Sequence, residues 1–75
     1  PVLEKENKVM FLGSDSDLYI AAQIAVRDAV NYLMDTQGLC FEEAYMLGSA
    51  MVDVKISQLV NPLYTVRAEI DISQL

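Results

Sequence analysis

The 75-residue chain is short, apolar and acidic, and these properties exclude several classes of function. Its 11 acidic and 5 basic residues give a net charge of −6, so it lacks the clustered Lys and Arg that nucleic-acid binding requires. Hydrophobic residues make up 53% of the sequence, which is too many for a disordered tail. A chain of this size forms one domain at most and buries only about 60% of the surface that its unfolded form exposes. We therefore expect part of the apolar surplus to contact a neighbouring domain or subunit.

A single cysteine, Cys40, and the absence of histidine limit the chemistry of the chain. One cysteine cannot form an intrachain disulfide, and no Cys and His spacing indicates a zinc site, which fits a reducing, cytoplasmic setting. No apolar stretch reaches the roughly 20 residues of a membrane-spanning helix, so no membrane partner is expected. The chain begins with Pro1, so it is either a fragment of a longer protein or a product whose initiator Met is removed.

The first half of the chain predicts a strand and a long helix. The apolar run Lys-Val-Met-Phe-Leu at residues 8–12 is typical of a strand buried on both faces. Residues 14–17, Ser-Asp-Ser-Asp, carry the oxygen atoms that accept hydrogen bonds at a helix start. A helix over residues 18–37 is predicted by one apolar stripe, which consists of Tyr19, Ala22, Val26, Ala29, Val30 and Leu33. Gly38 can close this helix in the left-handed conformation, with Leu39 folding back on the last turn.

The second half predicts another helix and two strands. A helix from Cys40 to about Asp53 is indicated by acidic residues in its first turn and by a stripe of helical period, Ala44, Leu47, Gly48 and Met51. Its small residues allow another backbone to approach closely. A strand over residues 54–60, a turn at Asn61-Pro62 and a strand over residues 64–72 follow, because apolar and polar residues alternate. We expect residues 1–75 to form a single α+β unit, with two helices packed on a small, mainly antiparallel sheet of three strands.

Several segments resemble the late region of acetamidases and formamidases. The blocks Glu-Ala-Tyr-Met-Leu at residues 43–47 and Asp-Val-Lys-Ile-Ser-Gln at residues 53–58 contribute most to the resemblance. Shorter matches lie at residues 13–18, 25–28 and 65–68. The family commonly has Ser where this chain has Cys40, which is a weaker helix cap.

The resemblance implies that the chain is the C-terminal segment of a larger, β-rich amidase. Family members carry a much longer N-terminal portion that holds the amide site. The parent protein would hydrolyse a small linear amide, formamide or acetamide, to the carboxylic acid and ammonia, with a divalent metal in the full-length protein. This segment would hold no cofactor and no metal of its own.

The pattern identifies no catalytic residue, and each candidate has a structural explanation. Asp15 and Asp17 could bind a cation, but helix capping is the simpler interpretation. Asp53, at the expected end of the second helix, needs a compensating charge, and an ion pair with an Arg or Lys, which Arg27 or Arg67 could supply, is favoured over a role as a catalytic acid.

The candidate nucleophiles also have structural explanations. Cys40 lacks the base that a nucleophilic thiol needs, so packing or capping is favoured. Ser49 follows Gly48 but lacks the second glycine of a serine elbow and lies inside a predicted helix, so close helix packing is the better interpretation.

Three functions are open at this stage. The first is a structural, inactive segment of an amide hydrolase, whose partner is the remainder of the parent chain. The second is a self-standing structural or oligomerisation module without enzymatic activity, since small cores often need self-association. A small-molecule binding module comes third, because no polar constellation specifies a ligand.

Overall fold

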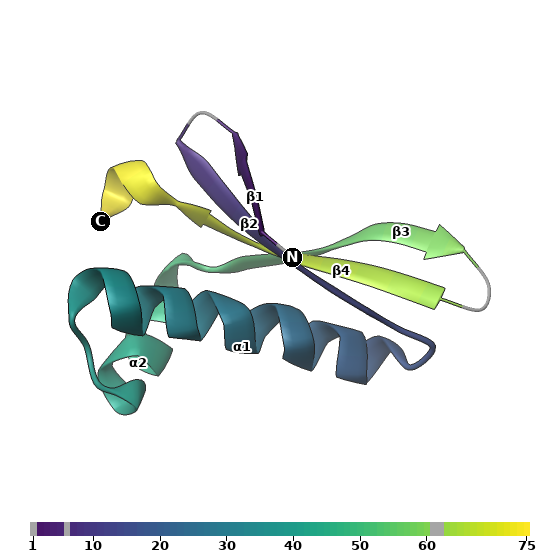
Figure 1. Ribbon diagram of the computed structural model, residues 1–75, viewed down its shortest axis with the longest axis horizontal. Helices are drawn as coiled ribbons and strands as arrows, with labels where there is room; N and C mark the ends of the chain where they lie inside the picture. Colours follow the sequence, from purple (N-terminus) through teal and green to yellow (C-terminus); the bar gives the residue numbers. More distant parts are fainter. Residues whose placement is uncertain (1, 6, 61–62) are drawn as a thin grey trace.

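Two helices lie against one face of a four-stranded antiparallel sheet in the computed structural model, which describes residues 2–5, 7–60 and 63–75 (Figure 1). The strands are β1 (Val2–Lys5), β2 (Lys8–Asp15), β3 (Asp53–Val60) and β4 (Leu63–Asp71). The helices are α1 (Leu18–Gln37), α2 (Phe41–Met51) and the short 3₁₀ helix η1 (Ile72–Gln74). The strand order is β1-β2-β4-β3 and every pairing is antiparallel. The predicted α+β class, with two helices on an antiparallel sheet, is confirmed.

The centre of the sheet is the pair β2 and β4, whose register aligns their apolar residues toward α1. Phe11 lies opposite Ala68, and both are buried together with Val9. Because successive strand residues point to opposite faces, Met10 and Leu12 lie on the other face, where they are only half-buried. The prediction that this strand is buried on both faces is therefore wrong: one face packs on α1 and the other has no helix over it.

Helix α1 begins and ends at the predicted residues, but its buried face is rotated from the predicted stripe. The residues that pack on the sheet include Ala21 and Ala25, neither of which was in that stripe, whereas Tyr19 is 70% exposed. A Cβ atom built on Gly13 of β2 would lie 2.2 Å from the Ala21 carbonyl oxygen and 2.8 Å from the Ala25 nitrogen. The alanines and this glycine therefore bring the helix backbone close to the strand backbone.

The ends of α1 follow the predicted chemistry. Gly38 has a φ of 65°, and its N–H donates to the Met34 carbonyl, as does the N–H of Leu39 at 3.2 Å. Leu39 is half-buried against the core, so the prediction that it folds back is confirmed.

The strands at the two edges differ from the prediction. β1 pairs with β2, with Leu3 opposite Met10, so the sheet has four strands rather than three. β3 begins at Asp53 and β4 ends at Asp71, where η1 takes over the residues that were predicted to continue the strand. The predicted turn at Asn61-Pro62 lies outside the described residues.

Candidate functional site

The two aspartates before α1 hold the start of the helix, and Asp17 is its N-cap residue. The Asp17 Oδ1 accepts hydrogen bonds from the N–H groups of Tyr19 at 2.8 Å and Ile20 at 3.4 Å. The Asp15 Oδ1 accepts from the N–H of Asp17 at 2.9 Å. The capping interpretation is confirmed for Asp17, the N-cap residue, whose carboxylate accepts from N–H groups of the first turn, whereas Asp15 holds the backbone of Asp17 in a turn just before the helix. Within the described residues, no group of three or more His, Cys, Asp or Glu is placed to hold a metal ion.

Cys40 is the N-cap residue of α2, and its environment disfavours a thiolate. Its backbone N–H donates to the Glu43 Oε1 at 3.0 Å, and this backbone hydrogen bond is the main cause that lowers the pKa of Glu43. In return, the backbone N–H of Glu43 donates to the Cys40 sulfur and lowers the pKa of the thiol, but the thiol's hydrogen bond to the Glu43 carboxylate, desolvation and its hydrogen bond to Glu42 together outweigh this, so that the pKa is raised. A thiol with a raised pKa is a poor nucleophile, which agrees with the structural interpretation.

The serine in α2 faces solvent, and its neighbour Gly48 makes the close helix contact. The Ser49 Oγ donates to the Tyr45 carbonyl at 2.9 Å within the same helix. Gly48 is buried, and a Cβ atom built on it would lie 3.7 Å from Leu33 and 3.9 Å from Val30 of α1. The packing role that was predicted for Ser49 therefore belongs to Gly48.

Asp53 makes an ion pair, but with a residue that the sequence analysis did not select. It is the exposed first residue of β3, after α2 ends at Met51, and its Oδ2 lies 3.4 Å from the Lys55 Nζ. Neither Arg27 nor Arg67 forms an ion pair with it among the described residues. The predicted pairing with an Arg or Lys is thus confirmed. The suggested partners Arg27 and Arg67 are wrong, because Lys55, an i,i+2 neighbour, lies on the same face of the strand.

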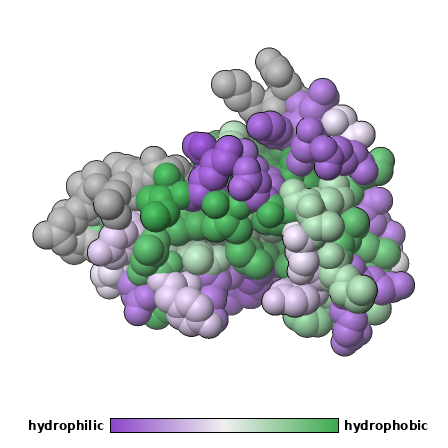
Figure 2. Space-filling model, turned by 180° about the vertical axis from the view of Figure 1, so that it is seen from behind, coloured by the Kyte–Doolittle hydropathy of each residue, from purple (hydrophilic) through white to green (hydrophobic). Residues whose placement is uncertain are grey.

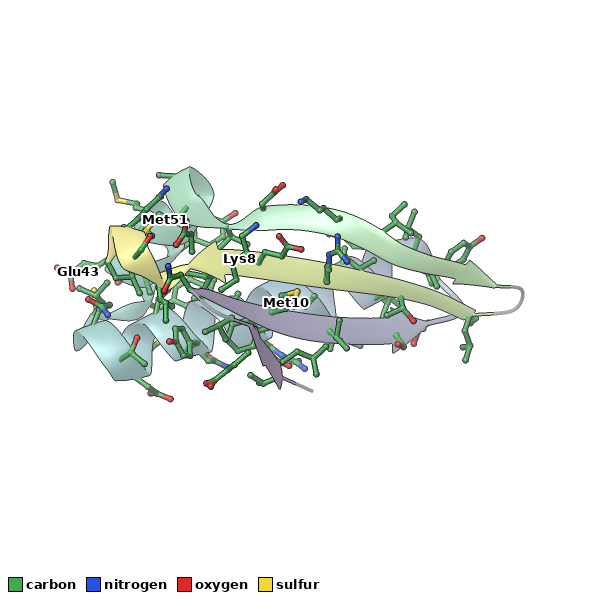
Figure 3. The ribbon with its side chains drawn as sticks, turned by 90° about the horizontal axis from the view of Figure 1, so that it is seen from above. Lys8, Met10, Glu43 and Met51 are labelled. Atoms are coloured by element: carbon green, nitrogen blue, oxygen red, sulfur yellow. The ribbon has the colours of Figure 1, made fainter. Side chains whose placement is uncertain are left out.

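A second carboxylate, Glu69 of β4, is the centre of a charge cluster on the sheet face opposite α1. Only 7% of Glu69 is exposed, and its carboxylate lies 2.5 Å from the Arg67 Nε, 3.5 Å from the Lys55 Nζ and 3.8 Å from the Lys8 Nζ. Lys8 is labelled in Figure 3, which looks down on the sheet with α1 behind it. Strands β2, β3 and β4 bring these cations together around one carboxylate. Because the carboxylate is already surrounded by cations, it offers no free acid or base. The cluster joins three strands instead.

The helix side of the molecule carries an open groove between α1 and α2 with a volume of about 580 Å³. Its apolar lining consists of Tyr19, Ala22, Val26, Val30, Phe41 and Tyr45. A smaller hollow of about 170 Å³ shares Val26, Val30 and Tyr45 and extends to Val54 of β3. We call these seven residues together the apolar groove. Figure 2 shows a continuous hydrophobic band on the side of the molecule that is hidden in Figure 1.

The chemistry of the apolar groove suits contact and not catalysis. The rings of Phe41 and Tyr45 stack with a centroid distance of 5.9 Å. Its polar border consists of Gln23, Arg27, Asn31 and Ser49 and includes no carboxylate, and the Ser49 hydroxyl donates to the Tyr45 carbonyl. An apolar surface with a polar rim is typical of a protein interface.

The fold and this surface define a class: a two-layer α+β unit with an uncovered apolar surface on its helix side. Two solved structures with this fold are acetamidases. The acetamidase of Bacillus halodurans is 34% identical with a TM-score of 0.89, and the match covers 99% of this chain and 25% of that one. The acetamidase of Yersinia enterocolitica is 33% identical with a TM-score of 0.87, and the match covers 97% of this chain and 22% of that one.

The predicted resemblance to acetamidases is therefore confirmed, and the chain has the fold of an acetamidase segment. It spans about a quarter of the length of these acetamidases. No family model and no curated protein matches the sequence. Within the described part of the chain, no helix is long and apolar enough to cross a membrane.

Proposed function

We propose that this chain is the C-terminal segment of a short-chain amide hydrolase that converts formamide or acetamide to the carboxylic acid and ammonia. Its role in that enzyme is structural. One observation supports this most strongly: acetamidases match almost the whole chain at 33–34% identity, while the chain matches only 22–25% of theirs.

The state of the reactive side chains supports a structural role. Hydrolysis of an amide needs an activated water and a group that protonates the leaving amine. In this chain Asp15, Asp17 and Glu43 accept backbone hydrogen bonds, and Glu69 is surrounded by cations. In the proposed enzyme, the amide site and a divalent metal belong to the remainder of the protein, and the unpaired Cys40 suits a cytoplasmic location.

A chimera tests this proposal. The matching quarter of the Bacillus halodurans acetamidase is replaced by residues 1–75, and ammonia release from acetamide and formamide is measured. We expect the chimera to hydrolyse acetamide and the purified 75-residue chain to release no ammonia. The control is the same acetamidase with that quarter deleted, which should be inactive. Activity of the isolated chain, or a folded chimera without activity, would contradict the proposal.

A second candidate is a self-standing oligomerisation module. The exposed apolar groove favours it, because a small chain can stabilise itself by covering such a surface with a second copy. Sedimentation velocity over a range of concentrations distinguishes the oligomerisation module from the enzyme segment. A defined dimer that persists on dilution would favour the module, whereas a chain that stays monomeric at low concentration would exclude it.

A further inference from the structure

The helices leave both edge strands of the sheet, β1 and β3, uncovered, and β3 borders the apolar groove. Val54 and Ile56 of β3 lie opposite the buried residues Ala68 and Val66 of β4, so their side chains point to the helix side of the sheet. They are nevertheless 46% and 54% exposed, because α1 packs on β2 and β4 and β3 is the edge strand. Two apolar side chains therefore face the helix layer with no helix over them.

Aromatic residues of the helices continue this uncovered surface. Tyr45 is 55% exposed, and Phe41 and Tyr19 are exposed to a similar or greater degree. Aromatic side chains bury roughly 150–250 Å² each and often dominate the energetics of interfaces. Three aromatic side chains line this groove together with Val26 and Val54. Covering the groove would therefore bury a large apolar area.

The opposite face of the sheet is less suited to an apolar contact. The Glu69 carboxylate there already has Lys8, Lys55 and Arg67 as partners, and covering these charges would remove water from them without a new partner. The apolar groove carries only Arg27 as a charged lining residue. Of these two broad faces, the helix side is the better site for contact with another protein body.

We propose that the apolar groove is the surface on which the remaining three quarters of the parent acetamidase pack. This inference rests on the proposed function. The acetamidases have this fold with about three times as much additional chain, which must contact it somewhere. Because that chain is covalently attached, its effective concentration is high, and a modest surface is enough for stable docking. The occupant is an apolar segment, with a carbonyl or carboxylate group facing Arg27.

Cysteine alkylation in the folded chimera described above tests this surface. Cys40→Ser first removes the native thiol. Tyr45→Cys then places a probe in the apolar groove, and Met46→Cys places the matched control on the next residue of α2, which is 73% exposed and does not line the groove. Alkylation at each position is followed by mass spectrometry and normalised to the rate in urea.

We expect Tyr45→Cys to react on the order of 10-fold more slowly than Met46→Cys, because packed side chains react only after local opening. Equal normalised rates would overturn the inference. Slow alkylation that is lost on dilution would also overturn it, since the occupant would then be a second copy.

The two proposals fail in different ways. A chimera that is active but has equal alkylation rates keeps the amidase proposal and overturns the surface. A folded, inactive chimera with a protected groove keeps the surface and overturns the amidase proposal. A chimera without cooperative unfolding overturns both, because a segment that packs through this surface must complete the fold.

Discussion

Asp17 and Glu43 show what single acidic residues do in this chain. The Asp17 carboxylate accepts hydrogen bonds from the first turn of α1, and Glu43 accepts one from the N–H of Cys40 before α2. Both carboxylates lie near a helix N-terminus, where the helix dipole favours negative charge. The acidic character of the chain is thus partly explained by helix capping.

Asp17→Ala is expected to destabilise the chain by about 1 kcal/mol, because two backbone N–H groups lose their acceptor. For a domain of this size, 1 kcal/mol corresponds to a decrease in Tm of about 4–8 °C. Thermal unfolding followed by circular dichroism measures this. Asp35→Ala, near the opposite end of α1, is the control and should leave Tm unchanged or slightly higher, since the dipole disfavours a carboxylate there. Equal losses in both variants would contradict the capping role.

The lowered pKa of Glu43 predicts that the stability of the chain depends on pH. Its pKa in the folded chain lies below the ordinary value of 4.5, with the Cys40 backbone hydrogen bond as the largest cause. A lowered folded-state pKa adds stability that is complete above the unfolded-state pKa and is lost as the pH falls through the folded-state value. The contribution of Glu43 should therefore be present at pH 7 and disappear below about pH 4.5.

Glu43→Gln should lower stability at pH 7, and the difference from the parent chain should shrink as the pH falls below about 4.5. Urea unfolding at several pH values measures the difference. Glu42→Gln makes the same change of charge in the same turn of α2 but leaves the hydrogen bond to Cys40 intact, so it should lower stability at pH 7 less than Glu43→Gln does. A difference for Glu43→Gln that stays constant from pH 7 to pH 3 would refute this explanation.

At the scale of elements, backbone contact between α1 and β2 organises the core. Gly13 faces Ala21 and Ala25 with no room for a side chain, whereas a Cβ atom built on Gly48 of α2 would have its nearest foreign atom, Val52 Cγ2, at 3.6 Å. The two glycines therefore have different roles. The first is required by helix-on-sheet packing, and the second lies in the interior of a helix in ordinary van der Waals contact.

Gly13→Ala and Gly48→Ala are expected to change stability in opposite directions. Gly13→Ala should cost roughly 3 kcal/mol or more, because α1 must move away from β2. Gly48→Ala should stabilise by up to about 1 kcal/mol, because alanine has the higher helix propensity and its methyl group fits. The midpoint of urea unfolding measures both variants. A mild effect of Gly13→Ala would show that α1 does not depend on this close approach.

At the scale of the whole molecule, the Glu69 cluster connects β2, near the start of the chain, with the consecutive strands β3 and β4 near its end. Lys8 comes from β2, Lys55 from β3 and Arg67 from β4 itself. The cations are partly exposed while Glu69 is buried, so the energy of the cluster depends mainly on the single carboxylate. A small core with about 60% of its surface buried benefits from such a connection.

Glu69→Ala is expected to cost about 1–2 kcal/mol, less than the roughly 3–5 kcal/mol of a fully buried pair, because the partner cations stay hydrated. Lys8→Ala should cost below about 1 kcal/mol, since two cations remain beside the carboxylate. The free energy of unfolding at low salt measures both variants. If Lys8→Ala proved as harmful as Glu69→Ala, the carboxylate would not be the centre of the cluster.

Local chemistry in the sequence determined the elements of this protein. The bounds of α1, its cap at Asp17, its end at Gly38 and the α+β class follow from side-chain oxygens, one glycine and the two hydrophobic periods, which act over a few residues. The acetamidase resemblance also depended on short blocks, and it was confirmed.

Only the tertiary structure decided which residues share a surface. Strand β1 has only four residues, some of them charged, and it forms because it pairs with β2. Which face of α1 is buried depends on Gly13, and the charge at Glu69 is stabilised by cations from other strands. The apolar groove between the helices extends to Val54 because the strand order puts β3 at an edge that α1 does not cover. The spacing of apolar residues predicts that an element has an apolar face. What each buried residue contacts is determined by strand order and register, because these pair residues from opposite ends of the chain.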